Sequence, residues 1–89
     1  MVALYPKIVF YPDRPWLAGE PIHCGDVIEV HFPDVGWVRG HVELARPDTW
    51  VLVDASGRGR RLEDGQFARW PQGGERDDDA RRATVYPPR

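Results

Sequence analysis

Glycine and proline are spaced so closely along this chain that a long helix is interrupted wherever it could begin. Nine glycines and nine prolines are spread over 89 residues. Proline removes a backbone donor and obstructs a helix interior, and glycine weakens a helix by about 1 kcal/mol relative to alanine. The segments between these residues are short, rich in branched and aromatic side chains, and bounded by turn residues. The sequence therefore predicts a chain made of strands and turns.

Two neighbouring segments, residues 27–32 and 37–44, show the alternation of a hairpin with one buried face. Residues opposite each other in such a pair point to the same side of the sheet, so even-numbered positions pair with even-numbered ones. Gly40 then falls on the core side without a side chain, which predicts a tight bend or a close backbone approach. The core side takes Ile28, Val30, Phe32, Val38, Val42 and Leu44, and the outer face takes Glu29, His31, Trp37, Arg39 and His41.

Four more segments extend the β pattern, and the one at residues 50–54 is apolar on both sides, which predicts cover on both. Five or six short strands with turns between them are typical of a small antiparallel barrel, and closing the sheet would remove its exposed edges. We therefore expect a barrel with an N-terminal extension over residues 1–71 and a polar linker with a proline-rich tail over 72–89. The further strands are expected at residues 7–11, 50–54, 60–63 and 67–70, with a turn or extended linker at 12–15.

Composition bounds the location and the chemistry of the chain. No apolar run approaches the roughly 20 residues of a transmembrane helix, and the N-terminus does not resemble a secretory signal. The single cysteine, Cys24, cannot form an internal disulfide, which favours a cytoplasmic address. Lys7 and Ser56 are likewise the only residues of their types, and Ser56 lies in a turn-like segment without a nucleophile motif. We expect no catalytic residue and no enzyme.

The histidines and acidic residues do not form a metal or acid–base motif. His23, Cys24, His31 and His41 lack the paired spacing of a zinc site, so we predict no metal and no cofactor. The aspartates beside glycine or proline are expected to cap their own turns. These are Asp26, Asp34, Asp54 and Asp64.

A stretch of about half the chain resembles the small SH3-like barrels of the Tudor group. It runs from Gly25-Asp26 through the segment 36–42, GWVRGHV, to Val51-Leu-Val-Asp54. The resemblance implies a binding barrel in which an aromatic cage reads methylated lysine or arginine by cation–π attraction. Trp37 matches the tryptophan beside that cage, whereas Val38 and Ala55 stand where the group carries aromatic residues.

The same stretch is also similar to KOW-type barrels, which are associated with RNA and ribosomes. Residues 25–30, GDVIEV, match the opening of that pattern, while Pro33 replaces its middle glycine and the usual lysines are missing. Both resemblances imply a small barrel, and they imply different ligands.

These observations favour a non-catalytic binding module that recognises a protein partner or a nucleic acid. The ligand would contact the outer hairpin face and an arginine-rich turn, where guanidinium groups suit phosphate contacts. The net charge of −2 argues against a general nucleic-acid binder, so a protein partner is favoured and no membrane is involved. The alternative is a small accessory or inhibitory protein that occludes a larger protein's surface. The predicted contact residues are His31, Trp37, Arg39, His41, Arg58, Arg60 and Arg61.

The positions of three tryptophans in the expected strands predict which side chains are buried and which is accessible. Trp50 and Trp70 lie in or beside apolar strands and are expected to be buried. Trp37 has the outward parity at the shoulder of the hairpin, so it is expected to be accessible and able to stack against a ligand.

Overall fold

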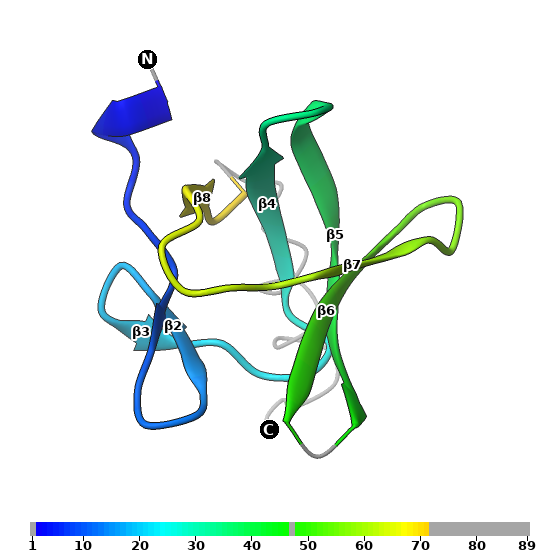
Figure 1. Ribbon diagram of the computed structural model, residues 1–89, viewed down its shortest axis with the longest axis horizontal. Helices are drawn as coiled ribbons and strands as arrows, with labels where there is room; N and C mark the ends of the chain where they lie inside the picture. Colours follow the sequence, from blue (N-terminus) through cyan, green and yellow to red (C-terminus); the bar gives the residue numbers. More distant parts are fainter. Residues whose placement is uncertain (1, 47, 72–89) are drawn as a thin grey trace, which may run out of the picture.

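The structure, a computed structural model, describes residues 2–46 and 48–71, and its strands form two antiparallel sheets (Figure 1). The predicted linker and tail at 72–89 lie outside the described residues. One sheet has the order β1-β2-β3 and the other β7-β6-β5-β4-β8. The elements are a 3-10 turn η1 (Val2–Leu4) and strands β1 (Val9–Phe10), β2 (Pro15–Leu17), β3 (Glu20–Pro21), β4 (Val27–Phe32), β5 (Gly36–Arg46), β6 (Thr49–Asp54), β7 (Gly59–Arg61) and β8 (Ala68–Arg69).

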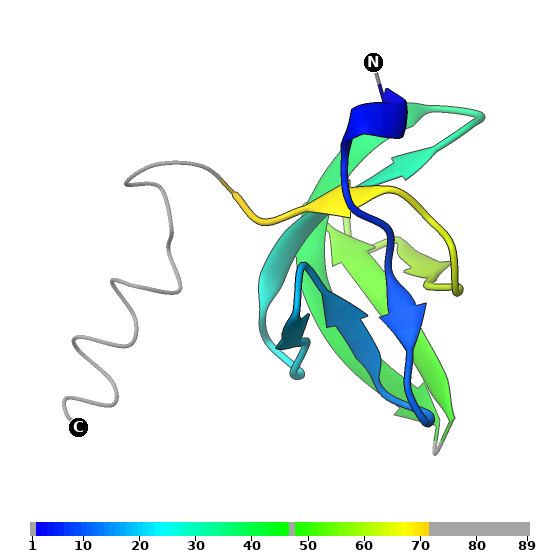
Figure 2. The same cartoon turned by 90° about the vertical axis from the view of Figure 1, so that its left-hand side faces the viewer.

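The predicted all-β, antiparallel and barrel-like class is confirmed, although the strands do not close into one continuous barrel. The three-stranded sheet lies across one face of the five-stranded sheet (Figure 2). The two meet where the chain before β1 runs beside the chain before β8. Ile8 N–H donates to the Gln66 carbonyl at 2.8 Å, and Ala68 N–H donates to the Pro6 carbonyl at 3.0 Å.

Apolar side chains from both sheets form one core. Burial of such side chains stabilises each by about 1.5–3 kcal/mol relative to exposure, so a small domain depends on sharing them across its layers. The three-stranded sheet and its flanks contribute Ile8, Leu17 and Ile22. The five-stranded sheet and its flanks contribute Ile28, Val30, Phe32, Val42, Trp50, Leu52, Leu62 and Ala68.

The predicted hairpin is confirmed in the limits of β4 and in the pairing of even-numbered with even-numbered residues, while β5 begins one residue earlier and ends two residues later than expected. Val30 pairs with Val38 and Ile28 with Gly40, so even-numbered residues do face the core. The placement of Leu44 in the core was wrong, because its side chain is 39% exposed. The register of β5 against β6 shifts between Leu44 and Arg46, and this irregularity takes the end of the strand out of the buried region.

The close approach expected at Gly40 is confirmed. A Cβ atom built on Gly40 would lie 3.0 Å from Leu52 Cγ and closer still to the carbonyl group of Val53. Only glycine leaves space for the neighbouring strand β6 at this point.

Strands β2 and β3 occupy a region that was expected to hold no strand. Pro15 begins β2 and Pro21 ends β3. Proline usually argues against a strand, so short strands that begin or end at proline are difficult to predict from sequence. A turn with positive φ at Ala18 and Gly19 joins the two strands. The hairpin matters because it carries Leu17 into the core and precedes buried Ile22.

The expected burial of the central strand and its tryptophan is only partly correct. Trp50 is 6% exposed, as predicted, and its Nε1 donates to the Asp13 carbonyl at 3.2 Å. Trp70 is half-buried and packs against the core. The expectation that β6 is covered on both sides was wrong, because Val51 and Val53 remain partly exposed on the outer side.

Candidate functional site on the outer face of the hairpin

The side of β4, β5 and β6 that points away from the core is called here the outer face. As predicted, it carries Glu29, His31, Trp37 and Arg39. In the structure, Glu29 lies opposite Arg39 and His31 lies opposite Trp37. Below these pairs, His41 lies between Val27 of β4 and Val53 of β6. The strands thus bring together four of the seven predicted contact residues. The face divides into two halves with different character.

The first half is closed by a group called here the clasp, formed by Tyr5, Glu29, Trp37 and Arg69. The Arg69 guanidinium lies over the Trp37 ring at 3.9 Å and over the Tyr5 ring at 5.2 Å. Arg69 Nε donates to Glu29 Oε1 at 2.5 Å, and Nη1 donates to the Tyr5 hydroxyl at 3.1 Å. The hydrogen bond to Glu29, followed by that to Tyr5, raises the pKa of Arg69 further above its already high ordinary value. Arg69 therefore stays positively charged, and the Glu29 carboxylate within the clasp balances that charge.

The clasp changes the role expected for Trp37. Its ring packs edge-to-face against Tyr5 at 4.9 Å and against His31 at 5.4 Å. Trp37 is half-buried, so the platform predicted for a ligand is already shared with side chains of this chain. The alternation of the strand correctly placed Trp37 on the outer face. Tyr5 and Arg69, which are distant in sequence, cover its ring.

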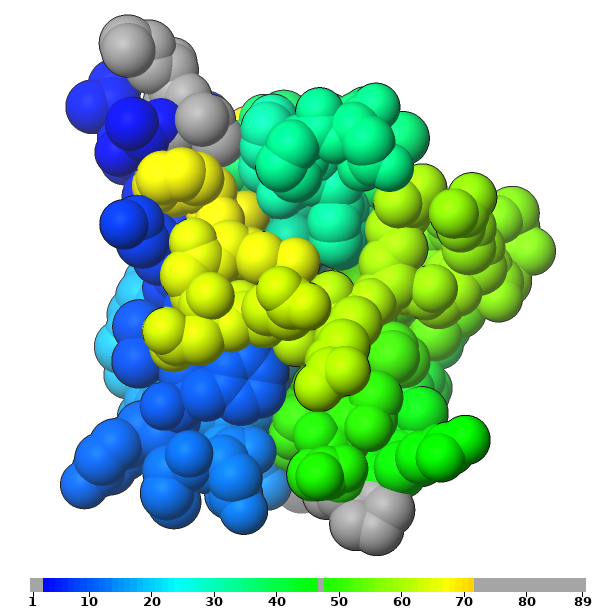
Figure 3. Space-filling model, viewed as in Figure 1, coloured from blue at the N-terminus to red at the C-terminus, as the bar shows by residue number. Residues whose placement is uncertain are grey.

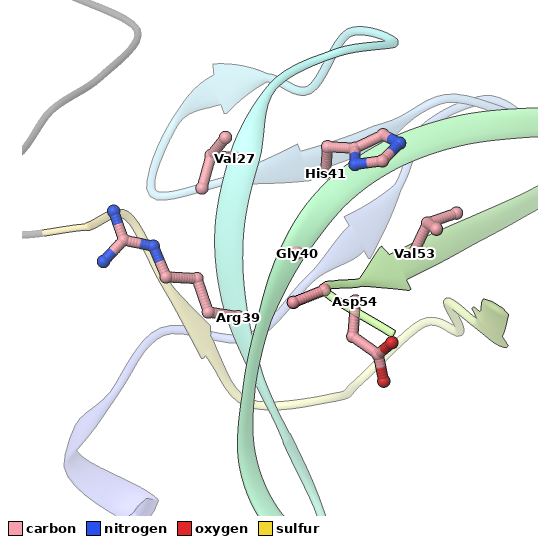
Figure 4. A pocket seen from close by; sticks show the side chains of 7 residues that line it. Val27, Arg39, Gly40, His41, Val53 and Asp54 are labelled. Carbon is pink, nitrogen blue, oxygen red and sulfur yellow. The ribbon is translucent and has the colours of Figure 1, made fainter. Parts of the chain in front are cut away.

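The second half of the outer face is a shallow open hollow of about 480 Å³. Figure 4 shows the backbone of Gly40 at its centre, with the guanidinium of Arg39 and the imidazole of His41 on opposite sides. His41 Nε2 lies 3.1 Å from Glu43 Oε2, and Arg39 Nη1 lies 3.9 Å from Glu29 Oε2. The lining combines apolar and polar groups, namely Val27, Arg39, Gly40, His41, Val53, Asp54 and Ala55.

The arginine-rich turn does not present its three arginines together. Arg58 and Arg61 are exposed, whereas the Arg60 side chain is only 15% exposed. Arg60 lies over the Phe32 ring at 5.2 Å, with Nη1 at 3.8 Å from Asp34 Oδ2. Its Nε is buried and has no hydrogen-bond partner among the described residues. A guanidinium folded onto the protein in this way contributes little to an exposed phosphate site.

Asp54 organises the turn between β6 and β7, as expected for an aspartate capping its own backbone. Its Oδ1 accepts the Ser56 hydroxyl at 2.6 Å and the N–H groups of Ser56 and Arg58 at 2.9 and 3.0 Å. The Ser56 hydroxyl, followed by the Arg58 N–H, lowers the pKa of Asp54. The carboxylate is therefore engaged in structure.

The other turn aspartates follow the expected pattern only in part. Asp26 accepts the His23 N–H at 2.8 Å within its own turn. Asp64 instead accepts the N–H of Phe10 in β1 at 2.9 Å, and Asp34 pairs with Arg60 across the molecule. Their carboxylates connect elements where self-capping was expected.

A second open hollow of about 510 Å³ lies where the turn after β4 meets the segment that leads to β8. The two segments lie side by side at the surface in Figure 3, in blue-green and yellow. Phe67 belongs to this lining, and Lys7 Nζ lies over its ring, 5.4 Å from the ring centre. The lining residues are His31, Pro33, Glu63, Asp64, Gly65, Gln66 and Phe67.

Four residues of the outer face were missed by sequence reasoning: Tyr5, Val27, Val53 and Arg69. The parity of their strands could have placed Val27 and Val53 there. Tyr5 carried no such signal, because η1 and the following residues have no alternation. Arg69 lies in a strand of two residues, too short to fix its orientation from sequence.

Two negative observations apply to the described residues. Within residues 2–46 and 48–71, no group of three or more histidine, cysteine, aspartate or glutamate side chains could hold a metal ion. Over the same residues, no helix is long and apolar enough to cross a membrane.

The chain was compared with protein-family models, curated proteins and solved structures. Residues 7–70 match a protein-family model described as "Domain of unknown function (DUF5348)". No curated protein and no solved structure gives a significant match. The resemblance to Tudor and KOW barrels therefore stays a prediction.

Proposed function

We propose that this chain, which belongs to the DUF5348 family, is a non-catalytic module that binds a partner protein through its outer face. The description of the family names no function, so the proposal is based on the structure of that face. An extended segment of the partner would lie along β5 and place an apolar side chain in the hollow around Gly40. The observation that carries this proposal is the hollow itself, which is open, largely apolar, and rimmed by polar groups held on strands.

The chemistry of the hollow supports a protein ligand. Val27 and Val53 supply apolar walls, and His41 and Arg39 supply hydrogen-bond donors at opposite rims. Apolar contact surrounded by polar groups is the usual composition of protein recognition surfaces. Strands hold these side chains in place, so binding needs little ordering of the site.

A nucleic acid is the less favoured ligand. The chain has a net charge of −2, and binding to phosphates depends on several accessible cationic groups. Arg60, the central residue of the arginine-rich turn, is folded onto Phe32 and paired with Asp34. This leaves Arg58 and Arg61 as the accessible cations of that turn.

We propose no catalytic role for the single serine and the single cysteine. The Ser56 hydroxyl donates to Asp54, and the same carboxylate accepts two backbone N–H groups, which is the geometry of a turn. Cys24 is exposed in the turn before β4. An activated nucleophile needs a base in hydrogen-bond reach and a shaped cavity around it.

A photo-crosslinking amino acid placed at position 53 tests the proposal. The same amino acid placed at position 20, on the three-stranded sheet, is the control. We expect one partner to crosslink from position 53 and none from position 20. With that partner purified, Val53→Arg should weaken binding at least tenfold, since a charge would enter the apolar wall, while Glu20→Arg should leave the affinity unchanged.

Equal affinity of the Val53→Arg and Glu20→Arg variants would overturn the proposal. Oligonucleotide binding that falls with salt and with a double change of Arg58 and Arg61 to alanine, but not with Val53→Arg, would replace it by a nucleic-acid role. If the partner is an enzyme, its activity in the complex separates simple recruitment from the alternative of an accessory protein that occludes a surface.

A further inference from the structure

Tyr5 sits in the clasp as a ligand would sit in a binding site. Its ring meets the Trp37 ring at 4.9 Å with an interplanar angle of 71°. Its hydroxyl accepts a hydrogen bond from Arg69 Nη1 at 3.1 Å, while the same guanidinium lies over the phenol ring. Glu29 holds Arg69 Nε at 2.5 Å, so the groups that receive the phenol are fixed by contacts that do not involve Tyr5.

The residues on either side of Tyr5 are exposed. Ala3, Leu4 and Pro6 are exposed, and the Leu4 side chain is 82% exposed. The Pro6 carbonyl accepts the Ala68 N–H at 3.0 Å, which anchors the segment at its end nearest the core. Tyr5 is thus the half-buried side chain of an otherwise exposed strap, defined here as residues 3–6.

We propose that Tyr5 is the resident occupant of a tyrosine subsite, which a tyrosine side chain of the partner protein enters when the strap moves away. This inference rests on the proposed function, because it specifies a residue of the same partner. It adds a second contact point beside the hollow and a competition between the strap and the partner for Trp37 and Arg69.

The chemistry of the subsite selects a phenol. Edge-to-face packing requires an aromatic ring. Arg69 repels a cationic side chain and offers Nη1 to an uncharged acceptor at the far end of the ring, which phenylalanine lacks. Glu29 already balances the Arg69 charge, so a neutral ligand suits the pair better than an anionic one.

The position of the subsite also predicts a spacing in the partner. Trp37 and His41 lie on the same face of β5, four residues apart, which corresponds to about 14 Å along a strand. An extended partner segment with a tyrosine at one position and an apolar residue four positions away would reach both the subsite and the hollow.

The test uses p-cresol as the probe and the indole N–H signals of the four tryptophans as the readout in solution NMR. Trp37 is assigned with Trp37→Phe. The other three indoles donate to the carbonyls of Tyr11, Asp13 and Leu17 and serve as internal references. In Tyr5→Ala, we expect p-cresol to shift the Trp37 signal saturably, with a Kd at least tenfold lower than in the unchanged chain. Toluene should bind several-fold more weakly than p-cresol.

Leu4→Ala is the matched control, because it shortens an exposed side chain of the same strap and should bind p-cresol as the unchanged chain does. Tyr5→Phe, which keeps the ring and removes the hydroxyl, should show intermediate affinity and guards against a folding defect in Tyr5→Ala. An unmoved Trp37 signal in both Tyr5 variants would overturn the inference, as would equal affinity for toluene and p-cresol.

The two proposals fail separately. If Val53→Arg leaves partner binding unchanged while p-cresol binds Tyr5→Ala, the proposal that the partner binds in the hollow fails and the proposal of the tyrosine subsite stands. If Val53→Arg weakens the partner while the Trp37 signal does not respond to p-cresol, the binding role stands without the subsite.

Discussion

Gly40 shows how one residue can satisfy two requirements at once. On the core side, it lets the backbone of β6 approach to a distance that no Cβ atom permits. On the outer side, its backbone forms the centre of the open hollow. The sequence indicated the first property through parity alone, because a core-facing glycine in a strand needs a structural reason. It gave no indication of the second.

Gly40→Ala is therefore expected to destabilise the domain by about 1–3 kcal/mol, the usual cost of overpacking a fixed site. Urea denaturation measures the difference. Gly59→Ala is the matched control, because its Cβ would contact only Val51, at 3.9 Å, and should change stability little. Equal effects of the two changes would mean that β6 can move away from Gly40.

Arg60 shows where residue type alone misleads. A run of arginines beside glycine suggests an exposed cationic tip, and Arg58 and Arg61 do remain exposed. Arg60 faces the other side of β7, where its guanidinium covers Phe32 and approaches Asp34. The alternation of a strand divides neighbouring charges between two faces, so a cluster in sequence is not a cluster on the surface.

At the scale of elements, apolar segments bounded by turn residues were predictable as strands, and the proline-flanked hairpin of β2 and β3 was not. The β4–β5 hairpin was correct in the limits of β4 and in which residues share a face, because six residue pairs must agree on which face is buried. β2 and β3, with three and two residues, were missed, whereas β8 lies within the strand expected at 67–70. The outer face was predictable to the extent that the long hairpin builds it.

The β6–β7 turn makes a specific prediction about pH. The pKa of Asp54 is lowered in the folded state, so its contribution to stability is present above the ordinary value near 3.8 and is lost as pH falls through the lower folded value. Asp54→Asn should lower the Tm at pH 7, and the difference should disappear as the pH falls below the folded pKa. Thermal unfolding between pH 7 and the acid range measures this.

Asp48→Asn, which removes the same charge at an exposed position before β6, is the control for this prediction. Its effect on Tm at pH 7 should be the smaller of the two. A deficit of Asp54→Asn that persists unchanged into acid would show that the turn depends on the shape of the side chain and not on its charge.

At the scale of the whole molecule, the two sheets form one unit because they share a core. Ile8, Leu17 and Ile22 belong to the smaller sheet or its flanks, and each is fully buried against the larger one. The sequence predicted one domain, but the part played by residues 15–22 in it was missed. Packing of Leu17 and Ile22 against side chains far away in sequence decides this contribution, and local patterns carry no information about it.

Leu17→Ala should therefore destabilise the entire domain by about 2–5 kcal/mol, the range for a truncated core leucine. Tryptophan fluorescence and far-ultraviolet circular dichroism during urea denaturation should give coincident transitions. Leu44→Ala, at an exposed site of β5, should change stability by less than about 1 kcal/mol. Transitions that separate in Leu17→Ala would mean that the smaller sheet unfolds independently.

The hydrogen bond between the Pro6 carbonyl and the Ala68 N–H fixes how strongly Tyr5 competes for its place. A group held by so short a tether has an effective local concentration on the order of millimolar or above. Free tyrosine at lower concentration would rarely displace it. A partner that also fills the hollow gains a second attachment, so only ligands that bind at two points would open the strap. Displacement of Tyr5 therefore depends on whether a ligand binds at two points, and less on its affinity for the subsite alone.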